Sequence, residues 1–475
     1  MHLEEVHVPA APLDRFEPVI GSDRLQQLRG VAKKMRDDFD GRTIWNVNST
    51  ATGGGVAEML QVLLAYIRGG DLDARWLVIK GDPAFYAITK RLHNGLHGSV
   101  GDQGPLGGRE QEHYARISAA NAEELHAQVR AGDVVILHDP QTAGLVGPMR
   151  RAGAVVVWRC HIGSDHRNDV TQGSWEFLRP FLEDADAYVF SRGVYVPDFV
   201  PTERAHIIAP SIDPFSAKNQ QMDQATVRAV LAHVGLIGGD GPGTMPTFQR
   251  EDGSPARVDH CADIVRTGPP PPPDVPFVVQ VSRWDRLKDM AGVMRDFAKH
   301  VNGASDAHLA LVGPNVSGVA DDPEGGEVLN ECYRVWRDLP HAERVRIQLA
   351  CVPMHDLEEN AAIINAVQRH ATVVVQKSLA EGFGLTVSEA MWKSRPVVAS
   401  AVGGITDQVV HGESGLLLDD PTDSEAFGEA LRSVLSDGAY AERLGRAAHQ
   451  RVNENFLGDR HLRQWAELFE RLGGA

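Results

Sequence analysis

The sequence predicts an α/β protein with two domains, each built around a doubly wound parallel sheet. Buried strands alternate with helices along both halves of the chain, and a Gly- and Pro-rich stretch separates the two series. Such alternation is typical of a parallel sheet with helices on both faces. The length of 475 residues also exceeds what one hydrophobic core usually serves.

The first series lies within residues 1–212, which we expect to form the N-terminal domain. An amphipathic helix is expected over 22–38. Short apolar runs rich in β-branched residues predict buried strands, and these are 43–47, 76–79, 134–137, 155–158 and 187–190. Helical stretches lie between them, for example at 56–67 and 122–130.

Residues 213–275 interrupt this pattern. They are rich in Gly, Pro and Asp and contain five successive prolines, Pro269 to Pro273. Because polyproline is stiff and extended, this stretch is expected to be a connector. A second strand–helix series then occupies 276–455, and its expected strands are 277–281, 309–312, 346–350, 372–375 and 397–399.

The overall charge of the chain disfavours two classes of binding partner. A formal net charge of −17 argues against nucleic acid and against an anionic membrane surface. The N-terminal residues show no signal-peptide pattern and no apolar run reaches about 18 residues, so a cytoplasmic protein is expected. The four cysteines are dispersed, which favours reduced thiols.

The segment 378–391 is the most informative about function. The apolar run 373–376 leads into a loop with two glycines, and a helix-forming run follows. This arrangement aims backbone N–H groups at an anion. Glu381 in the loop can accept hydrogen bonds from a sugar, and Glu389 on the helix can accept them from a ribose, so a sugar nucleotide is favoured over a buried unit with a surface glutamate. The residues expected to enclose the phosphates are Gly382, Phe383, Gly384, Leu385 and Thr386.

A basic pair, Arg283 and Lys288, follows the strand expected at 277–281. A guanidinium and an ammonium at the carboxyl end of a strand can neutralise a diphosphate leaving group. Cations aimed at that developing charge lower the barrier to its departure. The alternative is a solvated pair at a helix start, but the Glu381 loop in the same half favours the functional interpretation.

A run of three glycines, 53–55, lies between a strand and a good helix. It would let the backbone approach a phosphate or a sugar closely, and Gly54 and Gly55 are donor-binding candidates. The alternative is a tight turn. The run does not match the dinucleotide or P-loop patterns, so dinucleotide or ATP binding is disfavoured.

Polar residues follow the strands of the first half. His161 comes soon after the strand ending at Trp158, where doubly wound sheets present functional side chains. A second sugar needs several hydrogen-bond partners, and the candidates for an acceptor pocket are Lys80, Lys90, His93, Asp139 and Asp165. Asp184 and Asp186 are interpreted as capping or solvated charges, and no metal site is expected.

The spacing of Glu381 and Glu389 resembles the Glu-x7-Glu motif of retaining glycosyltransferases of family 4. The segments 48–58, 158–162 and 210–214 resemble one subgroup of that family, the trehalose glycosyltransferring synthases and the related trehalose phosphorylases. The resemblance implies a GT-B fold, with two Rossmann-like domains facing across a cleft. It also implies an acceptor domain over 1–212, a nucleotide-sugar donor domain over 276–455, and a last helix, 456–475, that returns to the first domain.

The resemblance further implies a retaining transfer of glucose from ADP- or UDP-glucose to free glucose, which gives α,α-trehalose. The departing phosphate would help to deprotonate the acceptor, His161 would lie near the donor sugar, and Arg283, Lys288 and Glu381 would complete the catalytic set. The partners are then a small sugar and a nucleotide sugar, with no cofactor or metal required.

Three alternatives stay open. They are a trehalose phosphorylase that uses inorganic phosphate, an α-glycosyltransferase with another small soluble acceptor, and an inactive sugar-binding or regulatory protein. The base of the donor, the reversibility of the reaction and the formation of a homodimer are also left open by the sequence.

Overall fold

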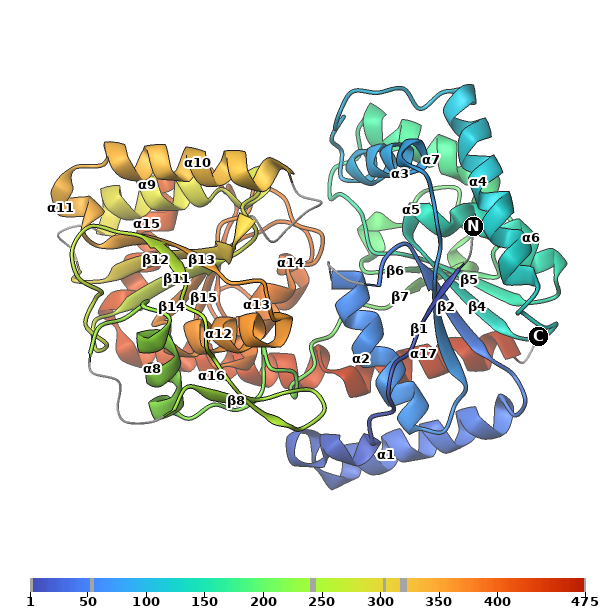
Figure 1. Cartoon of the computed structure of the whole chain (residues 1–475), viewed down its shortest axis with the longest axis horizontal. Helices are drawn as coiled ribbons and strands as arrows, with labels where there is room; N and C mark the ends of the chain where they lie inside the picture. The colour runs from blue at the N-terminus through green and yellow to red at the C-terminus, as the bar shows by residue number, and fades with distance from the viewer. Residues whose placement is uncertain (1–2, 52–54, 240–244, 302–304, 317–322, 474–475) are drawn as a thin grey trace. The chain divides into compact units, whose positions relative to one another are not determined.

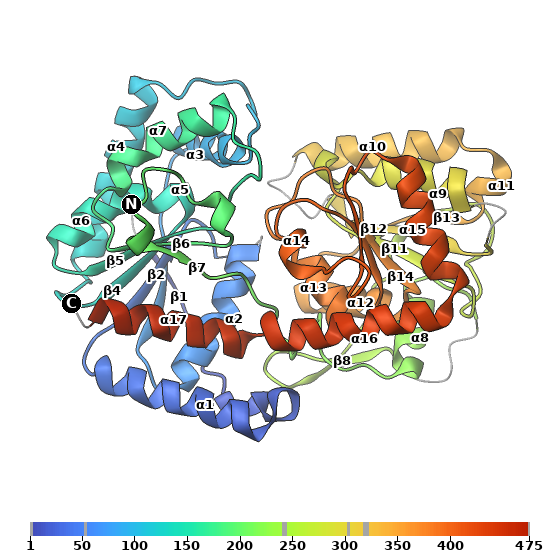
Figure 2. The same ribbon diagram turned by 180° about the vertical axis from the view of Figure 1, so that it is seen from behind.

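The structure is a computed structural model of the chain, and it describes residues 3–51, 55–239, 245–301, 305–316 and 323–473. Two views are given in Figures 1 and 2. The contacts divide the chain into two compact units. Unit 1 is Met1–Ser211 with Gly458–Ala475, and unit 2 is Ile212–Leu457.

Unit 1 contains a seven-stranded sheet in the order β1-β3-β2-β4-β5-β6-β7. All neighbours are parallel except β1 with β3. The strands are β1 (Glu4–Val6), β2 (Ile44–Asn48), β3 (Ala74–Val78), β4 (Val134–His138), β5 (Val155–Cys160), β6 (Ala187–Phe190) and β7 (Ala205–Ile207). The five strands expected from the sequence are present, with bounds shifted by at most two residues.

Helices cover both faces of this sheet (Figure 1). One face carries α1 (Glu17–Asp38), α2 (Gly55–Gly69) and α17 (Gly458–Gly473). The other carries α3 (Pro83–Leu96), α4 (Gly108–His126) and α7 (Asp169–Leu182). The short helices α5 (Asp139–Thr142) and α6 (Val146–Arg151) come between β4 and β5 along the chain. Because both faces are buried, the strands are apolar along most of their length.

The helix expected at 122–130 is wrong in its bounds, because α4 ends at His126. After it the chain turns toward β4 and passes through Gly132, whose φ of 87° is left-handed. The buried Asp133 carboxylate accepts from the backbone N–H of Arg130 and draws this segment into a turn. The same carboxylate accepts from the indole N–H of Trp45 at 2.9 Å and from the backbone N–H of Thr43 at 3.0 Å. These long-range contacts override the local helix propensity.

Unit 2 contains a second seven-stranded sheet in the order β10-β13-β12-β11-β14-β15-β16, and only β10 runs antiparallel to its neighbour. Its strands are β10 (Asp263–Val265), β11 (Phe277–Val281), β12 (His308–Pro314), β13 (Ile347–Val352), β14 (Val373–Gln376), β15 (Val397–Ser400) and β16 (Leu416–Leu418). Its helices are α8 (Gln224–His233), α9 (Met290–Val301), α10 (Pro323–Asp338), α11 (His341–Arg344), α12 (Leu357–His370), α13 (Leu385–Trp392), α14 (Ile405–Gln408), α15 (Ser424–Ser436) and α16 (Gly438–Asn455). The doubly wound α/β class is thereby confirmed for both units.

The stretch 213–275 has secondary structure of its own and belongs to unit 2. It contributes α8, which packs on α12, and β10, which extends the edge of the sheet. It also forms a hairpin of β8 (Thr247–Gln249) and β9 (Pro255–Arg257). Across the described ranges, no helix is long and apolar enough to cross a membrane.

Candidate active site

The loop after β14 is shaped by two glycines with left-handed backbone. Gly384 has a φ of 82°, and a Cβ there would lie 3.1 Å from the Cγ of Glu381. A Cβ at Gly403, whose φ is 53°, would lie 1.8 Å from the carbonyl oxygen of Glu381. The N–H of Gly404 donates to the carbonyl of Gly382 at 3.0 Å. The 403–404 turn therefore packs directly on the Glu381 loop, and α13 begins immediately after Gly384.

Lys288 and Glu381 form an ion pair. Strands β11 and β14 are neighbours, so the loops that follow them meet. The N–H of Leu379 donates to the carbonyl of Leu287 at 2.8 Å, which joins the two loops directly. The Lys288 and Glu381 side chains are 16% and 10% exposed. The structure thus brings together two residues that the sequence predicts on separate segments.

A buried lysine that the sequence analysis missed, Lys377, stabilises the turn that carries Lys288. Asp289 ends this turn with a left-handed φ of 46°. The buried Lys377 donates from Nζ to the Asp289 carboxylate at 2.6 Å and lies 3.2 Å from Asp296. Lys377 directly follows β14, and this position at a strand end is the signal that could have found it.

A buried polar network links the two loops further. Gln376, at the end of β14, donates from Nε2 to Ser282 Oγ at 3.1 Å and to Ser378 Oγ at 2.9 Å. Its Oε1 accepts from the hydroxyl of Thr386 at 3.2 Å. The first turn of α13 is thereby tied to the end of β11. Arg283 lies beside this network, 59% exposed, and pairs with Asp285 at 2.9 Å.

Glu389 lies on the buried face of α13. Its Oε1 is 3.7 Å from the Nζ of Lys218, a residue that the sequence analysis did not select. The backbone carbonyl of Glu389 accepts from the buried Nζ of Lys393 at 3.0 Å. Burial lowers the pKa of Lys393 well below its ordinary value, although the carboxylate of Glu389 opposes this shift. Lys218 lies four residues after the 210–214 segment, which carried part of the family resemblance. That proximity is the feature of the sequence that could have indicated it.

In unit 1, His161 and Asp139 lie together at the carboxyl ends of β5 and β4. The backbone N–H of His161 donates to Asp139 Oδ1 at 2.7 Å. The Nε2 of His161 lies 3.1 Å from the Nδ1 of His138, and the two rings stack at 5.4 Å between centroids. Burial lowers the pKa of His161 well below its ordinary value, and the charge of Arg159 adds to this effect. His161 is therefore a neutral imidazole near pH 7.

Asp139 has a left-handed φ of 64°, which costs energy for a residue with a side chain. Its carbonyl accepts from the indole N–H of Trp158 at 3.1 Å, which helps to hold this conformation. Burial raises the pKa of Asp139 to about 7, against the opposing effects of the His161 N–H and the charge of Arg159. A strained, buried carboxylate with such a pKa is typical of a functional site.

The other acceptor candidates are more scattered within unit 1. Lys80 pairs at 2.5 Å with Glu4, and Asp165 pairs with Arg192. Lys90 is exposed on α3. The ring of His93 lies edge-on to His97 at 4.9 Å, and His97 Nδ1 is 3.1 Å from the carbonyl of Gly163. Gly55 begins α2, whereas Gly54 falls outside the described residues.

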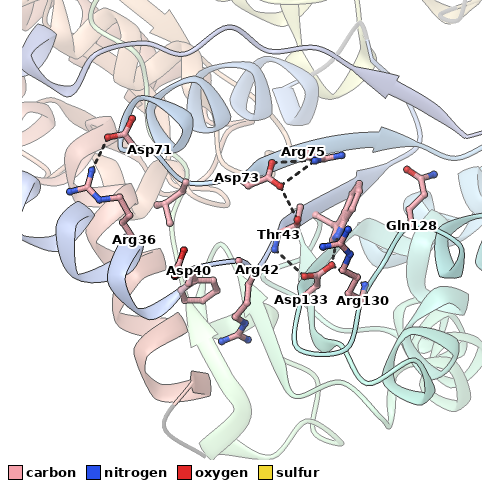
Figure 3. A pocket seen from close by; sticks show the side chains of 14 residues that line it. Arg36, Asp40, Arg42, Thr43, Asp71, Asp73, Arg75, Gln128, Arg130 and Asp133 are labelled. Atoms are coloured by element: carbon pink, nitrogen blue, oxygen red, sulfur yellow. Dashed lines mark hydrogen bonds and ion pairs between the residues drawn. The ribbon is translucent and has the colours of Figure 1, made fainter.

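A hollow of about 410 Å³ lies elsewhere in unit 1, at the amino ends of β2, β3 and β4 (Figure 3). Two ion pairs lie in its lining, Arg36 with Asp71 at 2.7 Å and Arg75 with Asp73 at 3.2 Å. None of the predicted site residues lines it. Functional groups of doubly wound sheets gather at the opposite, carboxyl ends of the strands, so this hollow lies outside the candidate active site.

The chain is similar along most of its length to known protein families. Residues 46–197 match the family described as trehalose synthase, N-terminal domain, and residues 264–451 match glycosyl transferases group 1. A trehalose synthase of Pyrococcus horikoshii is 32% identical over 462 residues, which cover 97% of each chain. The chain belongs to the trehalose synthase family. It is a glycosyltransferase, and the predicted family relationship is confirmed.

This trehalose synthase family member is also similar to a trehalose phosphorylase of Pleurotus pulmonarius, at 25% identity over 93% of this chain but only 58% of the fungal one. Among solved structures, an α,α-trehalose 6-phosphate synthase of Burkholderia multivorans has a TM-score of 0.64 at 16% identity, and the match covers 90% of this chain and 97% of that one. This likeness confirms the GT-B fold that the family resemblance implied. In the part of the chain that the structure describes, no group of three or more His, Cys, Asp or Glu side chains is arranged to hold a metal.

Proposed function

We propose that the protein transfers glucose from a nucleoside diphosphate glucose to free glucose, with retention of configuration, and forms α,α-trehalose. The observation that carries the proposal is the pairing of Lys288 with Glu381 at the adjoining ends of β11 and β14. A cation and a carboxylate side by side fit the two parts of such a donor, its diphosphate and its sugar. The trehalose synthases to which the chain is similar support the choice of product.

The leaving group would be stabilised from unit 2. The Lys288 ammonium and the Arg283 guanidinium would take up the charge that develops on the diphosphate as its bond to the sugar breaks. The turn from Gly382 to Thr386 would bring backbone N–H groups and the positive end of α13 to the same phosphates. Glu389 would accept hydrogen bonds from the ribose, with Lys218 beside it to orient its carboxylate.

The transfer would take place on one face of the donor glucose. The bond from C1 to the phosphate oxygen breaks, a bond from C1 to the acceptor oxygen forms on the same face, and the acceptor proton passes to the departing phosphate. This route needs no protein nucleophile, in contrast to retaining glycosidases. Glu381 would accept from hydroxyls of the donor glucose once the donor has replaced it at Lys288.

In unit 1, His161 would bind a sugar and Asp139 would position His161. The neutral imidazole of His161 can hydrogen-bond a sugar hydroxyl without adding charge. Asp139 holds the backbone of His161 in place, so it would act on the sugar chiefly through that residue. Lys80, Lys90, His93 and Asp165 stay acceptor candidates. Lys80 and Asp165 would first have to release their partners, Glu4 and Arg192.

A trehalose phosphorylase is the second candidate, because the fungal phosphorylase matches most of the chain. It would use the same cations for inorganic phosphate. A product assay separates the two: the purified protein is incubated with glucose and ADP-, UDP- or GDP-glucose, and separately with trehalose and phosphate. We expect trehalose and free nucleoside diphosphate from the first mixture. Glucose 1-phosphate from the second mixture, with no product from the first, would favour the phosphorylase.

A further inference from the structure

A buried polar cluster joins the last helix, α17, to the strand that carries His161. Arg159 lies on β5, two residues before His161, and is 1% exposed. Its Nη1 lies 3.2 Å from the Nε2 of His461 on α17, which is also 1% exposed. Both residues belong to unit 1 although they are 302 positions apart.

The partners of His461 determine where its proton lies. Its Nε2 accepts from Arg159 and also from the indole N–H of Trp465 at 3.1 Å. Guanidinium and indole groups can only donate, so Nε2 carries no hydrogen. The proton therefore lies on Nδ1 and points to the hydroxyl of Ser211 at 3.0 Å. Burial and the nearby Arg159 lower the pKa of His461 well below its ordinary value, so the ring stays neutral.

Arg159 is a buried cation with few hydrogen-bond partners in the described part of the chain. Its guanidinium lies 5.2 Å from the ring centre of Trp465, and in the described part of the chain its Nη2 finds no hydrogen-bond partner. A buried charge held so sparsely is costly to stability. The apolar contacts of Trp465, Leu468 and Phe469 already attach α17 to the core. The packing of the helix therefore gives no reason for a cation at this place.

The charge of Arg159 acts on groups that we assign to the sugar site. It lowers the pKa of Asp139, against the effect of burial, and it lowers the pKa of His138 and of His161. Arg460 is a further charged group close to Arg159, and its guanidinium donates to the carbonyls of Ala209 and Pro210. Arg159 thus favours an ionised Asp139 beside a neutral His161.

We propose that His461 is a positioning residue for the transfer reaction: it holds the Arg159 guanidinium where its charge acts on Asp139 and His161. The inference rests on the proposed function in one respect, that Asp139 and His161 serve the sugars. It assigns a role in the reaction to α17.

Two substitutions of His461 separate this role from packing. In His461→Gln the side-chain oxygen can still accept from Arg159, whereas in His461→Leu it cannot. We expect the Leu variant to lose about tenfold or more in kcat, and the acid limb of its kcat–pH profile to move up by about one unit as Asp139 loses a neighbouring cation. The Gln variant should keep most of the wild-type kcat, and the acid limb of its pH profile should stay close to that of the wild type. Glu470→Gln, which removes an exposed α17 partner of Lys34, should match the wild type.

Histidine NMR tests the inference without any substrate, so that its failure and the failure of the proposed reaction are distinguishable. With 15N-labelled histidine, the wild type should show His461 as the neutral Nδ1–H tautomer across neutral pH. The pKa of His161 should rise in His461→Leu and stay near the wild-type value in His461→Gln. If the Leu variant does not fold, Ser211→Ala, which removes the acceptor for Nδ1–H, should shift His161 in the same direction by a smaller amount. Unchanged His161 titration in the folded variants would overturn the proposal.

Discussion

Lys288 and Glu381 neutralise each other, although they are 93 positions apart. The proposed donor must therefore displace an existing partner of each residue. The diphosphate would replace Glu381 at Lys288, and the sugar hydroxyls would replace Lys288 at Glu381. A nucleoside diphosphate without its sugar can satisfy only the first half of this exchange.

Glu381→Gln should therefore bind a bare nucleoside diphosphate more tightly than the wild type while it loses catalysis. Glutamine keeps the shape of the side chain but leaves Lys288 without its competing carboxylate. We expect a lower Kd for the nucleoside diphosphate by calorimetric titration and a fall in kcat of at least tenfold. Weaker binding in this variant would contradict the exchange.

Lys288→Ala and Arg283→Ala should each lower kcat by about 10²–10³, the usual loss when one donor to a developing charge is removed. Arg286→Ala is the matched control, because Arg286 lies in the same turn but pairs with Glu324 and Glu331 on α10. The control should keep near-wild-type turnover. Circular dichroism and thermal unfolding should show all three variants folded. Normal turnover in Lys288→Ala would remove that residue from the leaving-group site.

Asp139 should make stability depend on pH. Burial raises its folded pKa to about 7, above the ordinary value of 3.8, so the folded state binds more protons than the unfolded state between these values. The free energy of unfolding should then fall as pH rises from about 4 to about 7. Asp139→Asn keeps an oxygen for the His161 N–H and tolerates the left-handed backbone. Urea unfolding at pH 5 and pH 8 should show a smaller difference in the Asn variant, and an equal difference would reject the assignment.

Gly384→Ala should damage the donor site and not only the fold. The left-handed backbone costs alanine about 1–2 kcal/mol, and its Cβ would also press on Glu381 and Ile405 at 3.1 Å. Gly412→Ala is the control, because Gly412 has a φ of 77° but no atom within 4 Å of an added Cβ. Both variants should lose similar stability in urea unfolding. Only Gly384→Ala should raise the KM for the donor or lower kcat, and equal kinetics in the two would show that the contact is unimportant.

Local patterns in the sequence were sufficient for the secondary structure and for the separate parts of the site. The strand at 187–190 was predicted with its final bounds because burial on both faces demands a continuous apolar run. The Glu381 loop was recognised because a strand, two glycines and a helix are consecutive along the chain. The helix expected at 122–130 ends at His126, because the buried Asp133 draws the segment that follows into a turn.

Only the tertiary structure decided which of these parts meet. The neighbouring positions of β11 and β14 in the sheet join Lys288 to Glu381. The neighbouring positions of β4 and β5 bring the Asp139 carboxylate to the backbone N–H of His161, a contact that the sequence did not indicate. His461 gave no local signal, because a histidine on an amphipathic helix acquires its partner Arg159 only when that helix packs on a strand 302 residues away. Strand order and helix docking are set by the burial of whole faces, and that is a property of the complete chain and not of any short segment.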